Sequence, residues 1–249
     1  MRLRLVHGFT QTGRSWGAVE ARLPYDWDIQ AIEVPDGLDF ATTAEAVGLR
    51  GSTGVWVGYS MGARLVLRLA LDRPDLVERL VLISGTAGLD SAGQREARQA
   101  SDEQLAVEVE RDGVGPFLDR WLDQRLFETL PRDAAMLDDR RKGNTVHRLA
   151  HQLRVLGQGA QDPLWDRLRE LTIPVLLITG AYDRAYTEAA QRLASGIRDA
   201  QVVTIAKAGH AVHLERPDEV AEALVAWLGS SPSGDPDPEP DSGTDATSR

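Results

Sequence analysis

Apolar residues follow two alternating patterns along this chain. Short apolar runs rich in β-branched residues recur at intervals, which is typical of strands buried on both faces. The segments between them repeat apolar residues every three or four positions, and this spacing predicts amphipathic helices. The predicted strands are LRLV (3–6), WDIQAIEV (27–34), GVWVGYS (54–60), RLVLIS (79–84), PVLLIT (174–179) and AQVVTIA (200–206); the predicted helical segments include 15–23, 61–71, 187–197 and 217–228.

This alternation predicts an α/β fold with one mostly parallel sheet of about six strands and helices on both faces, because parallel neighbours need crossover connections. Between about 87 and 160 no strand-like run occurs, and charged helical segments such as SAGQREARQASDEQLAVEVERDG dominate. We therefore expect a core of residues 1–86 and 161–230 and a helical cap of residues 87–160. Residues 231–249 are acidic and almost without apolar side chains, which predicts a disordered tail; an acidic docking segment is the alternative.

Size and charge exclude several functional classes. A chain of 249 residues is long enough for one large core, and no apolar run approaches the roughly 20 residues that a membrane helix needs. The formal net charge of -10 disfavours binding to nucleic acid, and no stable membrane insertion is expected. The chain has no cysteine and no secretory leader pattern, so we expect a cytoplasmic location. Oligomeric state is left open.

The clearest chemical signal is Gly58-Tyr59-Ser60-Met61-Gly62, a G-x-S-x-G sequence between a predicted strand and a predicted helix. In that context the serine is expected on a tight turn, with its hydroxyl above the sheet edge and beside a helix N-terminus. A glycine-rich turn without catalytic function is the alternative. A serine hydroxyl needs a neighbouring base before it can act as a nucleophile or base.

Asp183 and His210 meet that need in the required order along the chain. Each follows a predicted strand, so a parallel sheet would bring both to the edge that carries Ser60. A turn-capping aspartate and a surface histidine are the alternatives for each residue alone. His147 and His151, four residues apart, could share a helix face, but they lack further zinc ligands nearby, so we expect no metal site. His213 is expected to pack beside the site.

The loop HGFTQTGRSW after the first strand supplies a further candidate. Backbone N–H groups of Phe9 and Met61 are expected to form an oxyanion hole, and a purely structural turn is the alternative.

As an ordered set, HGF, GYSMG, GAYD and AGH resemble the α/β-hydrolase superfamily over residues 3 to 230. The chain opens almost directly on the strand that bears His7 and Gly8, where that superfamily has two earlier strands. Within it, the chain resembles the 2-succinyl-6-hydroxy-2,4-cyclohexadiene-1-carboxylate synthases, lyases of menaquinone biosynthesis. The stretches that carry this resemblance include HGFTQTGRSW, GYSMGARLVLRLAL, RQASDEQLA, FLDRWLDQRLF, RVLGQGAQDPLW and AGHAVHLERP.

The resemblance implies a small-molecule carboxylate substrate and no cofactor. Arg64, one helical turn after Ser60, fits the same chemistry, because a desolvated carboxylate needs charge-assisted partners. A surface arginine paired with an acid is the alternative for Arg64. The resemblance further implies Arg98, Trp121, Phe127 and Tyr59 as pocket residues, and a third arginine for which Arg148 and Arg154 compete, with Arg154 the better match. An ester or thioester hydrolase and a non-catalytic binding protein are the competing functions.

Overall fold

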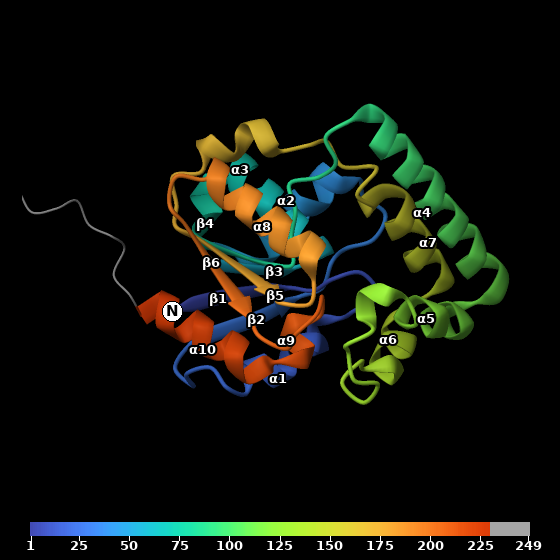
Figure 1. Ribbon diagram of the computed structural model, residues 1–249, viewed down its shortest axis with the longest axis horizontal. Helices are drawn as coiled ribbons and strands as arrows, with labels where there is room; N and C mark the ends of the chain where they lie inside the picture. The colour runs from blue at the N-terminus through green and yellow to red at the C-terminus, as the bar shows by residue number, and fades with distance from the viewer. Residues whose placement is uncertain (230–249) are drawn as a thin grey trace, which may run out of the picture.

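A single sheet of six parallel strands forms the centre of the molecule (Figure 1). The computed structural model describes residues 1–229, so the predicted tail of residues 231–249 lies outside the described residues. All six predicted strands are confirmed, in the spatial order β2-β1-β3-β4-β5-β6. They are β1 (Arg2–Val6), β2 (Asp28–Ile32), β3 (Gly54–Tyr59), β4 (Val77–Ile83), β5 (Val175–Gly180) and β6 (Ala200–Ile205).

Helices cover both faces of the sheet (Figure 1). One face carries α2 (Phe40–Gly51), α3 (Met61–Asp72) and α8 (Arg184–Gly196), and the opposite face carries α1 (Gly17–Glu20), α9 (Val212–Glu215) and α10 (Pro217–Gly229). Each face buries its own hydrophobic cluster. The central strands β3 and β5 are buried along their whole length, as their continuous apolar runs predict.

A helical segment lies between β4 and β5, at the sheet edge where the strands end (Figure 1). It consists of α4 (Ala92–Asp112), α5 (Val114–Leu122), α6 (Leu137–Gly143) and α7 (Val146–Leu156). Residues 87–160, all of which the structure describes, contain no strand. These helices share a small core of their own, made of Ala106, Val109, Phe117, Leu118, Leu149, Ala150 and Leu153. We call residues 87–160 the cap.

Within residues 1–229, no helix combines the length and the apolar character that crossing a bilayer requires.

Candidate active site

Ser60 lies between β3 and α3 with φ at 51°. Positive φ is uncommon for a residue with a side chain and recurs at functional turns. The flanking glycines allow this turn to pack closely. A Cβ on Gly62 would lie 2.2 Å from the Val6 carbonyl oxygen, and one on Gly58 would lie 2.5 Å from the Gly62 backbone. A side chain at Gly62 would push the serine turn away from β1, and one at Gly58 would collide with the first turn of α3.

Ser60, His210 and Asp183 form a hydrogen-bonded chain. His210 Nε2 lies 3.0 Å from Ser60 Oγ, and His210 Nδ1 lies 2.7 Å from Asp183 Oδ2. Because an ionised carboxylate only accepts, Nδ1 carries the proton and Nε2 is left to accept from the serine hydroxyl. His210 and Asp183 are buried, at 2% and 8% exposure. Ser60 follows β3, Asp183 follows β5 and His210 follows β6, so the parallel sheet brings together residues up to 150 positions apart.

Ser84, which the sequence analysis did not single out, supports this histidine. It lies at the end of β4 with its side chain fully buried, and its hydroxyl donates to the His210 carbonyl oxygen at 2.9 Å. The Tyr186 ring packs on the imidazole with 4.4 Å between centroids. The signal for Ser84 in the sequence is its place at the end of a predicted strand, at the same sheet edge as Ser60.

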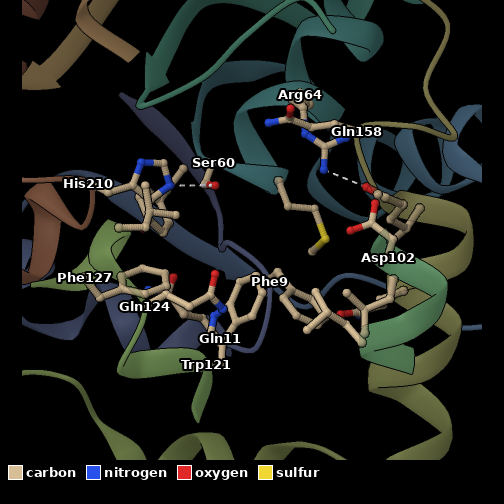
Figure 2. A pocket seen from close by; sticks show the side chains of 18 of the residues that line it. Phe9, Gln11, Ser60, Arg64, Asp102, Trp121, Gln124, Phe127, Gln158 and His210 are labelled. Atoms are coloured by element: carbon tan, nitrogen blue, oxygen red, sulfur yellow. Dashed lines mark hydrogen bonds between the residues drawn. The ribbon is translucent and has the colours of Figure 1, made fainter. Parts of the chain in front are cut away.

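A cavity of about 280 Å³ opens between this edge and the cap. Figure 2 shows Ser60 and His210 on one side of it and Arg64 with Asp102 on another, while aromatic rings close the side below them. The cavity has both apolar walls and a few charged groups, as small-molecule sites commonly have. The residues expected there from the sequence that line it are Phe9, Tyr59, Met61, Arg64, Arg98, Trp121 and Phe127.

Arg64 is a buried cation of the pocket wall, 6% exposed. Its guanidinium donates to Gln161 Oε1 at 3.0 Å and to the Leu156 carbonyl oxygen at 2.6 Å, and both acceptors are neutral. No carboxylate of the described residues pairs with it. Burial lowers the pKa of Arg64 to about 10, so the group stays charged at neutral pH.

Arg98 lines the same wall but has an acidic partner. Its Nε donates to Asp102 Oδ1 at 2.8 Å, and Asp102 is only 2% exposed. Desolvation raises the pKa of Asp102, and the nearby Arg98 opposes that rise. The pair leaves the rest of the Arg98 guanidinium available to a ligand.

The expectation for Arg154 is wrong in its placement, because this residue does not line the pocket. Arg154 lies on the outer side of α7 and forms ion pairs with Glu103 and Glu110 of α4 at 2.8 and 2.6 Å. The competing candidate, Arg148, also lies elsewhere, near Asp36 and the Val34 carbonyl oxygen.

Arg140 of α6 is the third arginine that lines the cavity. It is 2% exposed, and burial lowers its pKa to about 10. Its Nε donates to the Ala135 carbonyl oxygen at 2.7 Å, and within residues 1–229 no carboxylate pairs with it. Its sequence neighbour Arg141 points outward to Asp119, so the pattern of charges alone could not distinguish the two.

The three remaining histidines singled out from the sequence have other surroundings. His147 and His151 stack on α7 with 6.1 Å between their rings, and the described part of the chain holds no cluster of three or more potential metal-ligating side chains. His213 is buried between Trp16 and Tyr59, at centroid distances of 4.8 and 4.2 Å. Desolvation holds the pKa of His213 well below its usual range, so it packs as a neutral ring.

Known proteins resemble this chain over nearly its whole length. Residues 5–223 match the alpha/beta hydrolase family. A Bacillus subtilis (strain 168) protein provisionally named as a 2-succinyl-6-hydroxy-2,4-cyclohexadiene-1-carboxylate synthase is 32% identical, over 90% of this chain and 89% of that protein. The synthase of that name from Serratia proteamaculans (strain 568) is 28% identical over 90% and 91% of the two chains. The structure of MenH from S. aureus superposes with a TM-score of 0.86 at 24% identity, over 92% and 93%. These alignments cover the cap as well as the core.

Proposed function

Since this chain belongs to the alpha/beta hydrolase family, we propose that it is a 2-succinyl-6-hydroxy-2,4-cyclohexadiene-1-carboxylate synthase, a carbon–oxygen lyase that releases pyruvate in menaquinone biosynthesis. Two relatives with that activity in their names align with nine-tenths of the chain. The proposal makes it a cytoplasmic enzyme of a small carboxylate substrate.

The observation that carries the proposal is the pair of buried arginines, Arg64 and Arg140, in the wall of the serine pocket. Within residues 1–229 neither guanidinium forms an ion pair, and the one carboxylate that acts on Arg64 from nearby, Asp102, is already paired with Arg98. Burying a cation without a directly paired counter-ion is costly, so a pocket that holds two of them suits a ligand that brings negative charge. Guanidinium groups bind carboxylates through paired, charge-assisted hydrogen bonds. A simple ester offers no such charge, whereas the substrate of this lyase carries several carboxylates.

In the proposed reaction Ser60 acts as a base. His210, held by Asp183, accepts the hydroxyl proton of Ser60, and the serine oxygen removes a proton from the ring carbon next to the succinyl carbonyl. The electron pair of the broken C–H bond moves toward the carbonyl oxygen, then returns to form the second ring double bond. The C–O bond to the enolpyruvyl group breaks, and that group leaves as the enolate of pyruvate. The enolate takes up the proton held by His210 and becomes pyruvate, while Ser60 keeps the ring proton as its hydroxyl hydrogen.

The negative charge on the succinyl oxygen needs donors in the transition state. We assign this role to the backbone N–H groups of Phe9 and Met61, two residues that line the same pocket as the serine. Met61 is the first residue of α3, where free N–H groups and the positive end of the helix dipole favour an anion. Arg64, Arg98 and Arg140 would hold the carboxylates and so fix the ring over Ser60.

A serine ester hydrolase is the second candidate, because the hydrogen-bonded Ser60, His210 and Asp183 are also the groups of an acyl-transfer enzyme. There Ser60 would attack a carbonyl carbon and form an acyl-enzyme. In the lyase reaction Ser60 removes a proton, whereas in the hydrolase reaction it attacks a carbon atom, and the two reactions release different products.

Product analysis of the purified protein separates the candidates. With the enolpyruvyl cyclohexene substrate we expect pyruvate release, followed through lactate dehydrogenase, that vanishes in Ser60→Ala and persists in Arg184→Gln, a change at an exposed ion pair of α8. Turnover of p-nitrophenyl esters without pyruvate release would establish the hydrolase instead. A binding protein would show neither turnover, while Ser60→Ala would retain the affinity of the native chain for the substrate.

A further inference from the structure

The turn that carries Phe9 contains a strained residue. The Gln11 N–H donates to the Gly8 carbonyl oxygen at 3.2 Å, so Phe9 and Thr10 are the two central residues of the turn. Thr10 has φ at 67°, in the left-handed region, and this second central position ordinarily holds glycine or asparagine when φ is positive. A β-branched residue is strained there, and such strain persists only where the surroundings impose it.

Two side chains of the cap hold Thr10 in this conformation. Arg140 Nη1 donates to the Thr10 hydroxyl, and Asn144 Nδ2 donates to the Thr10 carbonyl oxygen at 2.7 Å. Asn144 Nδ2 also donates to the Arg140 carbonyl oxygen at 2.8 Å, which ties the two cap residues together at the end of α6. Thr10, Arg140 and Asn144 are 1%, 2% and 7% exposed, so water does not compete for these bonds.

The cap also encloses the turn on either side of Thr10. The Phe9 ring packs edge-on against Trp121 of α5, with 5.0 Å between centroids. At the end of α6, Gly143 approaches Thr12 so closely that a Cβ on the glycine would lie 2.2 Å from Thr12 Cγ2. The turn therefore has little room to relax while the cap is in place.

From this arrangement we infer that Asn144 is a positioning residue, which holds Thr10 in its left-handed conformation and thereby fixes the direction of the Phe9 N–H. The inference rests on the proposed function, in which that N–H stabilises the oxyanion.

The connection runs through one peptide group. The Gly8–Phe9 peptide is planar and trans, so the Phe9 N–H points opposite to the Gly8 carbonyl. That carbonyl oxygen accepts from His7 Nδ1 at 2.8 Å and from the Gln11 N–H. If Thr10 returns to negative φ, the Gln11 N–H leaves Gly8 and the peptide that carries the donor loses one of its two anchors. Asn144 acts on the reacting atoms only through this turn.

A double-mutant cycle tests the inference, with pyruvate release as the readout. Asn144→Ala is expected to lower kcat about tenfold, because losing an oxyanion donor altogether costs roughly 10² to 10³ and a misaligned donor loses part of that. KM is expected to change less than about twofold, since the donor acts in the transition state. Glycine adopts positive φ without strain. In the Thr10→Gly background, the additional Asn144→Ala change is therefore expected to lower kcat by less than about twofold.

The matched control is Arg141→Gln. Arg141 lies on α6, just before Asn144, and its exposed ion pair with Asp119 of α5 does not involve the turn, so its loss is expected to leave kcat unchanged. Asn144→Leu has a similar volume without the donor and replaces Asn144→Ala if that variant fails to fold. Native kcat in the Asn144 variant, or the same loss in the native and Thr10→Gly backgrounds, would overturn the inference.

Labelling of Ser60 by a small alkyl fluorophosphonate keeps this test separate from the proposed function. The Ser60 oxygen forms a bond to phosphorus, fluoride leaves, the serine proton passes to His210, and the phosphoryl oxygen occupies the oxyanion position. The intact mass of the protein follows the rate at which Ser60 is labelled. We expect this labelling rate to be lower in Asn144→Ala than in the native chain, and to differ little between Thr10→Gly and the double variant. If the native chain releases no pyruvate but the labelling pattern holds, the lyase proposal fails and this inference stands. If native Ser60 is not labelled, or the pattern is absent, the inference is overturned.

Discussion

Arg64 Nη1 donates to Gln161 Oε1 at 3.0 Å, in a buried contact between helix α3 of the core and the segment that follows the cap. Gln161 is only 1% exposed and neutral, so it orients the guanidinium without cancelling its charge. An acid at this position would satisfy the arginine within the protein. The neutrality of Gln161 therefore leaves the positive charge of Arg64 to the ligand.

Gln161→Glu is expected to raise KM for the lyase substrate at least about tenfold, because the new carboxylate would pair with Arg64 and compete with the carboxylate of the substrate. We expect a smaller effect on kcat, since Ser60 and His210 keep their geometry. Steady-state pyruvate release measures both constants. Gln191→Glu makes the same chemical change at an exposed position of α8 and serves as the control. An unchanged KM in Gln161→Glu would exclude Arg64 from carboxylate binding.

Asp183→Asn is expected to lower kcat by about 10³ to 10⁴ while KM stays nearly constant. The asparagine amide can donate to His210 Nδ1, which shifts the ring proton to Nε2 and removes the acceptor that Ser60 needs. Steady-state assays of pyruvate release give kcat and KM. Glu188→Gln, at an exposed ion pair of α8, is the control for charge loss. Residual activity within tenfold of the native rate would mean that His210 does not depend on Asp183.

The sequence predicts the sheet and the positions of Ser60, Asp183 and His210 for one physical reason. Two-sided burial produces continuous apolar runs, and in a parallel sheet the residues that follow those runs meet at one edge. Helix α2 was not predicted, because its buried face is built largely from small residues such as Ala44, Gly48 and Gly51 rather than from large apolar ones. Gly48 allows a close approach, since a Cβ there would lie 2.4 Å from Leu69 Cδ1.

The arginines of the cap could not be assigned from the sequence, because their roles depend on the orientation of short helices. Arg140 and Arg141 are neighbours in a charged stretch, yet one is buried in the pocket wall and the other is exposed. Helix α6 follows Met136, which has φ at 54°, and its last residue, Gly143, lies against Thr12 in the loop after β1; these two features set the orientation of the helix. Neither feature leaves a periodic signal in the sequence.

Asp102 gives a pH-dependent test of the cap. Desolvation raises its pKa above the ordinary value of 3.8, so the folded chain binds this proton more tightly than the unfolded chain does. Its contribution to stability is therefore full below about pH 4 and is lost as pH rises through the raised pKa. Asparagine does not titrate, so the Tm of Asp102→Asn minus that of the native chain is expected to increase between about pH 4 and pH 7.

Thermal unfolding at several pH values measures this difference, in which the other titrating groups largely cancel. Asp162→Asn makes the same substitution at an exposed position beyond the cap and is the control. A difference for Asp102→Asn that stays constant or falls with rising pH would contradict the assigned direction of the pKa shift.

Arg140 lines the pocket and Arg154 does not, although the sequence favours Arg154 as the third carboxylate contact. Arg140→Met is expected to raise KM for the lyase substrate at least about tenfold, because a desolvated carboxylate loses its charge-assisted partner. Arg154→Met is expected to leave KM and kcat within about twofold, since its guanidinium is engaged by Glu103 and Glu110 outside the pocket.

The ion pairs of Arg154 join α7 to α4, so we expect Arg154→Met to lower the thermal stability of the protein rather than to change its kinetics. Because these pairs are partly exposed and screened by solvent, their loss is expected to lower Tm by only about 2–4 °C. Kinetics and thermal unfolding of the two variants, which carry the same substitution, make the comparison direct. A large rise in KM for Arg154→Met together with native kinetics for Arg140→Met would return the third carboxylate contact to α7, and would mean that α6 and α7 are oriented differently around the pocket.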